Sequence, residues 1–497
     1  MICSSSNVSR LLRPKAANGL LAALLYTGLM SIARADDQLD EQLTTMLANA
    51  GFTGRVESTL EQRLGRPINR DLAELGRLLW FDKITGLHSD NTCAGCHSPT
   101  NGFGDTQSIA IGIQNNNFVG ANRTGPRNQR RTPMVINNAF YPKLMWNGRF
   151  SSRSGNPFDN GKGFLFPEPE GTTKFPPGAP EFYHLLVAQA HIPSTEQIEV
   201  AGFTGTGGIF DDGLGSPVPP PDGTGFRNEP IRQAVLSRLN ATPSYRTLFG
   251  ALYPEVSKGG PITFTMAGQA IAEFEFTLTF ANAPIDRFAR GERSTMTTQQ
   301  KRGALLFFGK AGCVQCHAVA GPSNEMFSDF QMHTIGVPQI APVFGVATGN
   351  LEFSGPGADE DFGLEDFTGN PADRYRFRTS PLRNVTLQPA FFHNGCFTRL
   401  EDAVAHHLNP VKSARQYDAV KAGVSADLTL RQGPILPVLL RLDPLLRAAR
   451  PMSRDEFDAL VAFLREALLD PRARPRNLRY LVPVSVPSGM PPLQFEF

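Results

Sequence analysis

The chain has 497 residues, of which 41% are hydrophobic, 19% are charged, 47 are glycine and 40 are proline. This length predicts about three structural units, and the composition indicates a globular protein with many ordered loops, which excludes a solenoid, a coiled coil or a disordered chain. Four of the 48 Lys and Arg residues lie in residues 1–35, which hold none of the 46 acidic residues, so the remaining chain has a formal charge of −2. With no basic block, we do not expect nucleic-acid binding.

Residues 1–35 have the pattern of a cleaved secretory signal. A basic start that includes Arg10 and Lys15 precedes an apolar run over residues 20–33, and Ala33–Ala35 is an A-x-A cleavage site. The run is shorter than the roughly 20 residues that span a membrane, and no comparable run follows. We therefore expect a periplasmic protein without a membrane span.

Two pairs of cysteines each continue into a histidine. In the C-x-x-C-H motif, two thiols form thioethers with the vinyl groups of a haem, and the histidine binds the iron. The sequence therefore predicts two covalently bound haem c groups. The predicted attachment residues are Cys93, Cys96, Cys313 and Cys316, and the predicted iron ligands are His97 (haem one) and His317 (haem two).

Other uses of these cysteines fit less well. A redox dithiol explains neither the histidines nor the repetition, and zinc needs four close ligands, whereas the pairs lie roughly 220 residues apart. Cys3 falls in the signal and Cys396 is alone, so there is no disulfide framework, although the compartment would allow one. For Cys396 we expect only a small, partly buried residue.

The pattern around the two motifs is repeated. Residues 74–81 and 301–308 both carry Leu and Phe at i, i+3, i+4 spacing, which predicts an amphipathic helix before each haem loop. We expect a mainly α fold of two cytochrome c-like haem domains related by duplication, with long Gly/Pro-rich loop insertions. The predicted parts are domain one (36–235), with loops at 156–180 and 202–230, domain two (236–470) and a C-terminal tail (471–497).

Short motifs surround the two haem sites in a fixed order. They are Leu75–Asp82 (LGRLLWFD), Gly102–Asp105 (GFGD), Arg131–Asn137 (RTPMVIN), Met145–Arg149 (MWNGR), His333–Pro338 (HTIGVP), Phe377–Thr379 (FRT), Leu382–Asn384 (LRN) and Phe392–Gly395 (FHNG). In this order the chain resembles the bacterial dihaem cytochrome c peroxidase and MauG family over most of residues 70–465. The loops after Asn156 and Gly202 are insertions relative to the short family members.

The resemblance implies a peroxide site at one haem, an electron-transfer centre at the other, and a tryptophan between them. Trp146 matches this tryptophan; the alternative is a core aromatic residue. In the family, the sixth ligand of haem two lies fourteen residues beyond the histidine of a His-x-Gly motif, as Met in peroxidases and Tyr in MauG types. That histidine is His393 here, so the implied ligand is His407.

The local sequence agrees with a ligand at His407. Thr398 and Glu401 form a capping-box pattern, which predicts that a helix begins there. His407 then shares an apolar face with Leu400 and Val404, while His406 points to a more polar face. The alternative is a hydrogen-bonded core histidine. Imidazole in place of a thioether favours ferric iron and lowers the potential of haem two, which favours MauG-like behaviour with shared oxidising equivalents.

The resemblance also locates the distal side of haem one. In many relatives a histidine sixteen residues beyond the proximal one caps the resting iron, and Ile113 occupies that position here. We expect an open haem one that needs no reductive activation, unless another side chain binds the iron. The candidates for such a ligand are His88, His184, His191 and Met134.

Peroxide cleavage needs a group that moves a proton from one oxygen to the other. The family uses a Glu downstream of the tryptophan, and residues 190–202 are the corresponding segment. Glu199 is the first candidate and Glu196 the second, with His191 as a hydrogen-bonding neighbour. The alternative is a surface helix with solvated acids.

Calcium is doubtful. Many relatives hold calcium between the domains through an Asn in an Arg-Asn-x-Pro element, and Arg131 occupies that position here. A cation does not bind a cation, so Arg131 would replace the charge of the metal or pair with a haem propionate.

The resemblance thus implies a dihaem c-type peroxidase that reduces hydrogen peroxide to water with electrons from a small c-type cytochrome or copper protein docked near haem two. Three alternatives stay open. They are MauG-like oxidation of a protein or organic substrate, oxygenase chemistry on an apolar polymer as in related rubber-cleaving dihaem proteins, and a non-catalytic electron carrier with both irons six-coordinate. A homodimer is usual in the family.

Overall fold

The computed structural model describes residues 37–343 and 353–497, so the predicted signal peptide lies outside the described residues. Helices supply most of the regular structure, and the strands are only two or three residues long, in agreement with the predicted mainly α fold. The helices are α2 (Leu60–Leu64), α3 (Arg70–Phe81), α4 (Cys93–Cys96), α5 (Leu185–Gln189), α6 (Asn228–Ala241), α7 (Pro243–Leu252), α8 (Pro254–Ser257), α9 (Phe264–Thr277), α10 (Pro284–Ala289), α11 (Thr298–Phe308), α12 (Glu365–Thr368), α13 (Leu400–Leu408), α14 (Pro410–Arg415), α15 (Leu436–Leu440), α16 (Arg454–Ala462) and α17 (Pro475–Leu478).

The strands form three small sheets, one local and two that join segments distant in the chain. β2 (Lys143–Leu144), β3 (Phe150–Ser152) and β4 (Phe164–Leu165) form an antiparallel sheet, with β4 inside the first predicted loop. The other two sheets are an antiparallel pair of β5 (Met332–His333) with β6 (Phe377–Arg378), and a parallel pair of β1 (Phe118–Val119) with β7 (Gln494–Phe495).

The helix that precedes each haem motif forms as predicted. The Asn69 side chain caps α3, and Thr297 and Gln300 form a capping box at α11. Each helix packs closely on a second helix through a glycine. A Cβ on Gly76 would lie 1.8 Å from the carbonyl oxygen of Ala270 in α9, and one on Gly303 would lie 2.0 Å from that of Ala459 in α16. The same type of helix pair therefore supports both haem motifs.

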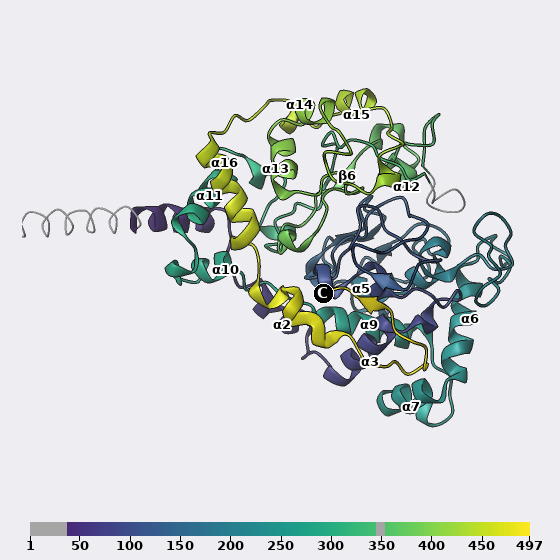
Figure 1. Cartoon of the computed structure of the whole chain (residues 1–497). Coiled ribbons are helices and arrows are strands. Elements are labelled where there is room, and N and C mark those ends of the chain that lie inside the picture. The colour runs from purple at the N-terminus through teal and green to yellow at the C-terminus, as the bar shows by residue number, and fades with distance from the viewer. Residues whose placement is uncertain (1–36, 344–352) are drawn as a thin grey trace, which may run out of the picture.

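These helix pairs organise two lobes, which Figure 1 shows one above the other. The lower lobe contains α3, α5, α6, α7 and α9, and the upper lobe contains α11 and α13–α16. One hydrophobic cluster joins Leu75, Val235 and Leu278, whereas another joins Leu43 and Leu47 with residues 283–468. We therefore propose that the units divide near residue 280, in place of 235/236, and that residues 37–52 belong with the second unit.

The second predicted loop and the tail both cover the lower lobe. Residues 202–227 contain no helix or strand, and α6 begins at Asn228. The tail passes from the upper to the lower lobe (Figure 1) and is fixed there by β7 and by Ser488, whose backbone N–H and hydroxyl both donate to the buried carboxylate of Asp82.

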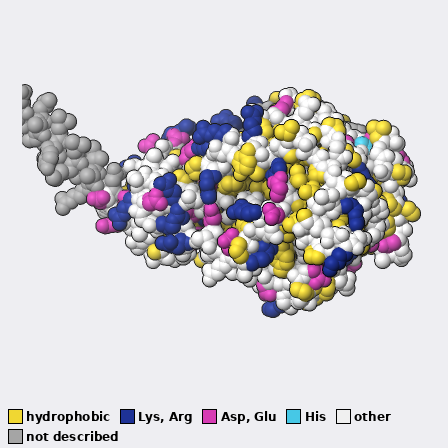
Figure 2. Space-filling view, turned by 90° about the horizontal axis from the view of Figure 1, so that it is seen from below, with side chains coloured by type: hydrophobic (Ala, Val, Ile, Leu, Met, Phe, Trp, Pro, Cys, Tyr) yellow, Lys and Arg dark blue, Asp and Glu magenta, His cyan; other side chains and the backbone are white. Residues whose placement is uncertain are grey.

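The exposed surface is mixed in character. Figure 2 shows acidic and basic side chains interspersed with hydrophobic ones on the face seen from below. Among the described residues, every helix is too short or too polar to cross a bilayer.

A buried ion pair joins α10 to Arg383 within the second unit, and it yields a stability prediction. Arg383 binds both carboxylate oxygens of Asp286 at 2.8 Å, and both side chains are at most 1% exposed. Arg383→Ala leaves this carboxylate buried and unpaired, so we expect a loss of about 3–5 kcal/mol in the free energy of unfolding. Urea titration measures this loss. Arg287→Ala, also in α10, is the control: it breaks only an exposed pair with Glu292, just after the helix, and should leave stability nearly unchanged.

Candidate functional site

The structure brings His317 and His407 to opposite sides of one cavity. His317 follows Cys316, and His407 lies near the C-terminal end of α13; their ring centroids are 6.1 Å apart. The Nδ1 atoms are hydrogen-bonded to the backbone carbonyls of Phe327 (2.9 Å) and Ala403 (2.8 Å), which leaves both Nε2 atoms free. Two imidazoles that bind the same metal ion from opposite sides, each with a metal–nitrogen distance of about 2 Å, have their ring centres about as far apart. Burial lowers the pKa of both, so both imidazoles are neutral at pH 7, as metal ligation requires.

The neighbouring histidine is placed differently from the prediction. His406 is completely buried, and its ring nitrogens are hydrogen-bonded to the carbonyl oxygen of Ile335 and the hydroxyl of Ser413. The predicted polar face at His406 is therefore wrong. The capping box is also absent, because Thr398 donates to the carbonyl oxygen of Ala422 and Glu401 pairs with Arg465.

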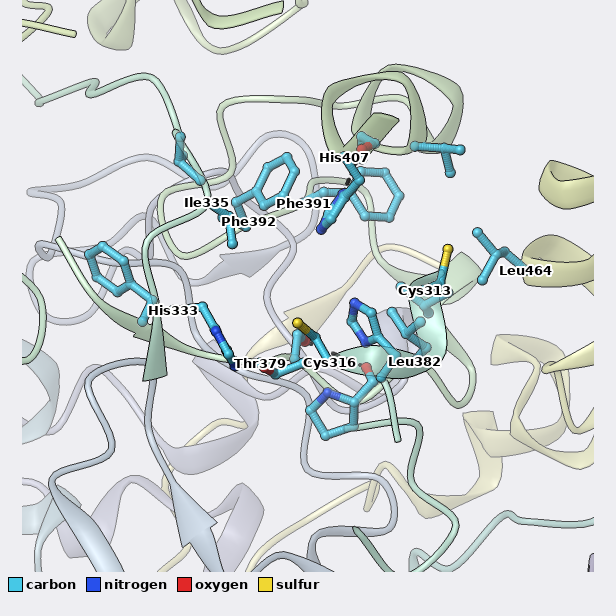
Figure 3. Close-up of a pocket in the computed structure, with 18 of the residues that line it drawn as sticks. Cys313, Cys316, His333, Ile335, Thr379, Leu382, Phe391, Phe392, His407 and Leu464 are labelled. Carbon is cyan, nitrogen blue, oxygen red and sulfur yellow. Dashed lines mark hydrogen bonds between the residues drawn. The ribbon is translucent and has the colours of Figure 1, made fainter. Parts of the chain in front are cut away.

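The rest of this cavity is largely apolar. Figure 3 shows His407 reaching down from α13 toward the turn that carries Cys313 and Cys316, with Phe391, Phe392, Leu382 and Leu464 around them. The empty space, its open mouth included, is about 1670 Å³. Its aromatic and aliphatic lining is typical of a site that binds a large apolar, planar group.

A second cavity of about 1420 Å³, its open mouth included, surrounds Cys93, Cys96 and His97. The Nδ1 atom of His97 is hydrogen-bonded to the carbonyl oxygen of Phe103 at 3.3 Å, and Trp80 of α3 lies against the ring with centroids 5.6 Å apart. Burial lowers the pKa of His97 to about 4. His97 therefore presents a neutral, oriented imidazole, as a metal ligand requires.

Two carboxyl groups that are close in the chain, Glu196 and Glu199, line the same cavity together with Arg149. Glu199 lies in η7 (Gln197–Ala201), a π-turn of the type often found at functional sites, and Glu196 directly precedes it. Arg149 Nη2 lies 3.7 Å from Glu196 Oε1. Burial, assisted by Glu196, raises the pKa of Glu199 to about 7, and burial also raises the pKa of Glu196 although Arg149 opposes it. The solvated surface helix considered as the alternative is therefore wrong.

The other candidate ligands of haem one are mostly occupied elsewhere. Ile113 packs with Ile198, Phe203 and Phe210, outside the cavity. The three candidate histidines have other partners. His88 pairs with Asp90 and Asp212, and both ring nitrogens of His184 are hydrogen-bonded. The ring of His191 packs among Phe175, Phe182 and Phe264. Met134 lines the cavity and is the one alternative candidate that does so.

The two cavities share a wall. Trp146, Met134, Tyr141 and Arg378 line both of them. Trp146 is 9% exposed and donates from its indole nitrogen to the carbonyl oxygen of Arg131 at 2.7 Å. The tryptophan is therefore a buried core residue that also lies between the two cavities.

Arg131 contacts only oxygen atoms of uncharged groups. Its guanidinium donates to the carbonyls of Gln107 and Asp105 and to the side chain of Gln388, and burial lowers its pKa to about 10. Metal ions are usually held by His, Cys, Asp or Glu side chains. Among the described residues, one set of three such side chains lies close enough to share a metal ion: Cys316, Asp329 and His333. Cys316 already belongs to a haem motif.

Both cavities fit a covalently attached haem. Each has the two thiols and a histidine with a free Nε2 atom. Buried polar atoms without partners also line the first cavity: Arg149 Nε, Arg378 Nη1 and Trp80 Nε1. Buried donors are nearly always paired, and the two propionate carboxylates of a haem would supply acceptors for these groups.

Sequence reasoning missed Arg149, Arg378 and Glu275 as cavity residues. Arg149 and Arg378 lie in the motifs MWNGR and FRT. The sequence predicts a role in MWNGR only for Trp146 and none in FRT. Glu275 lies in α9, which no motif marked. It is 2% exposed and lines the first cavity.

Comparison with known proteins agrees with this arrangement. Residues 70–294 match the family model for di-haem cytochrome c peroxidase. The chain is 28% identical over 357 residues to cytochrome-c peroxidase IdrP1 of Pseudomonas sp. strain SCT, covering 68% of this chain and 72% of the relative. It is 26% identical to the methylamine utilization protein MauG of Methylorubrum extorquens, covering 69% and 70%. The crystal structure of the diheme peroxidase BthA from Burkholderia thailandensis shares the fold, with a TM-score of 0.54 at 19% identity and coverage of 83% and 89%.

The fold and the paired cavities thus define a dihaem protein of the c type. The match of residues 70–294 to the di-haem family model, together with the similarity to cytochrome-c peroxidases and to MauG, implies two haem c groups.

Proposed function

We propose that the protein is a periplasmic dihaem peroxidase that reduces hydrogen peroxide to water at the His97 haem and receives electrons through the His317 haem. The observation that carries this proposal is the contrast between the two cavities. One contains a histidine together with the carboxyl groups of Glu196, Glu199 and Glu275, and the other is apolar and flanked by two histidines. When bound, the haems supply the redox chemistry.

The residues of the first cavity handle protons and charge. Glu199 takes a proton from the peroxide oxygen nearer to His97 and returns it to the leaving oxygen, so that water departs. Arg149 holds Glu196 and stabilises negative charge in the cavity. Trp146, in the shared wall, is the relay for electrons between the two sites.

The electron donor is a small c-type cytochrome or copper protein that docks near the second cavity. Turnover of the purified holoprotein with hydrogen peroxide and reduced cytochrome c tests the function. We expect two cytochromes to be oxidised for each peroxide consumed. A holoprotein with both haems that leaves peroxide unconsumed would contradict the proposal, and a Cys93→Ala/Cys96→Ala variant gives the background without haem one.

A second candidate function is favoured by His407. An imidazole opposite His317 lowers the potential of haem two relative to a His/Met pair, which makes electron transfer from a high-potential donor less favourable. MauG-like oxidation of a protein or organic substrate then becomes the alternative use of the same peroxide site. Peroxide consumption without cytochrome oxidation would select it.

A further inference from the structure

A third carboxyl group lines the first cavity, away from Glu196 and Glu199 in the chain. Glu275 lies in α9 and accepts a hydrogen bond at Oε1 from the side-chain amide of Asn138, at 2.6 Å. Its Oε2 atom is buried and has no hydrogen-bond partner, and neither does Asn138 Oδ1. The carboxyl is therefore half satisfied inside the haem cavity.

Within residues 37–343 and 353–497, the helices and the turn packed on α9 bring no positive charge to Glu275. The elements packed on α9 are α3, α5 and the turn η4 (Asn138–Phe140), and none of them contributes a charged side chain to the cavity. The charged groups of the cavity come from other segments: Glu196, Glu199, Arg130, Arg131, Arg149 and Arg378. No described Lys or Arg forms an ion pair with Glu275.

Glu275 also lies close to the point where haem one is attached. Burial raises the pKa of the Cys93 thiol to about 12, and among the ionisable neighbours Glu275 adds most to this, ahead of Cys96 and Glu199. Burial likewise raises the pKa of Glu275 to about 8, although the Asn138 amide opposes this. The Glu275 carboxyl can therefore gain or lose a proton beside the haem near pH 8, and it is ionised above that pH.

Glu273 shows what a structural carboxylate on this helix looks like. It is fully buried as well, but both of its oxygens accept hydrogen bonds from Arg66 at 2.7 Å, and it does not line the cavity. Buried ionisable groups without such a partner are costly and are common at functional sites. The contrast indicates that Glu275 is not held in place for stability.

We propose that Glu275 is the redox-linked proton site of haem one. It takes up a proton from solvent when that haem accepts an electron from the donor, and releases the proton when the haem is oxidised again. Added negative charge nearby favours the neutral form of a carboxyl group, which couples the two events. One electron enters the haem, one O–H bond forms at Glu275, and no other bond changes. The inference rests on the proposed haem one at His97 and deepens the proposed function, because peroxide reduction consumes protons together with electrons.

Spectroelectrochemical titration of the holoprotein between pH 6 and 10, without peroxide, tests this site. One proton per electron makes a tenfold change per pH unit, so the haem-one potential should fall by up to about 59 mV per pH unit. We expect Glu275→Gln to flatten this slope above about pH 8 and Glu273→Gln to leave it unchanged. Asn138→Ala, which removes the amide that stabilises the carboxylate, should move the sloping region to higher pH.

Redox-difference infrared spectroscopy gives an independent readout. Reduction should produce a carboxylic acid C=O band that is absent in Glu275→Gln and present in Glu273→Gln. A slope and a band that both survive in Glu275→Gln would overturn the proposal. Because no peroxide is present, this outcome is distinct from failure of the peroxidase function, which the turnover assay measures.

Discussion

Glu199→Gln is expected to lower kcat/KM for hydrogen peroxide by about 10²–10⁴-fold, the usual contribution of a positioned acid–base group. The glutamine keeps the shape and the hydrogen-bonding capacity of the side chain but cannot move a proton. The backbone of the turn should not change, because Asn91 holds the Glu199 carbonyl oxygen and not its carboxyl group. Stopped-flow mixing of ferric protein with peroxide measures the rate.

The pH dependence of kcat/KM also tests the role of Glu199. Glu199 must be ionised to accept the proton, and burial raises its pKa to about 7. In the wild type, kcat/KM should therefore rise as pH increases through about 7, and Glu199→Gln should lose this rise. Glu196→Gln is the matched control in the same turn, and its effect should be smaller. A larger loss in Glu196→Gln than in Glu199→Gln would assign the proton transfer to Glu196.

His407→Met is expected to raise the potential of haem two by on the order of 0.1 V or more, within the ~0.8 V range that axial ligands control. A thioether stabilises ferrous iron relative to an imidazole, so the variant should approach a His/Met peroxidase. Potentiometric titration followed by the absorbance of the low-spin haem measures the shift.

The adjacent histidine offers the control for this variant. His406 has the same side chain, but both of its nitrogens bind protein groups and it does not line the cavity. His406→Met should reduce stability and leave the potential of haem two within experimental error. Equal shifts in the two variants would show that His407 is not the ligand.

The haem sites could be predicted from the sequence because their chemistry is local. In each motif the two thiols and the histidine lie within five residues, and the helices before the motifs follow apolar spacing with their own caps. The family resemblance and the apolar face of one helix predict His407 as a ligand of haem two. The structure places the centre of its ring 6.1 Å from that of His317.

The remainder of the site depends on tertiary contacts. Thr398 and Glu401 have a capping pattern but bind Ala422 and Arg465 instead, because those partners lie close in the folded chain. Glu275 faces the haem-one cavity because α9 packs on α3, and neither its position nor its missing partner leaves a local signal in the sequence. The placement of residues 37–49 on the second unit also depends on a tertiary contact. The buried pair of Asp40 with Lys301 joins segments that are far apart in the chain.

Low-temperature EPR of the purified ferric protein, before and after addition of peroxide, tests the central claim most directly. We expect one high-spin signal from an open haem one and one low-spin signal of bis-imidazole character from His317 and His407. Peroxide should change these signals rapidly without prior reduction. Two low-spin signals and no reaction with peroxide would contradict the account. That result would mean that a side chain such as Met134 closes haem one, and that the protein is an electron carrier or an enzyme that needs reduction first.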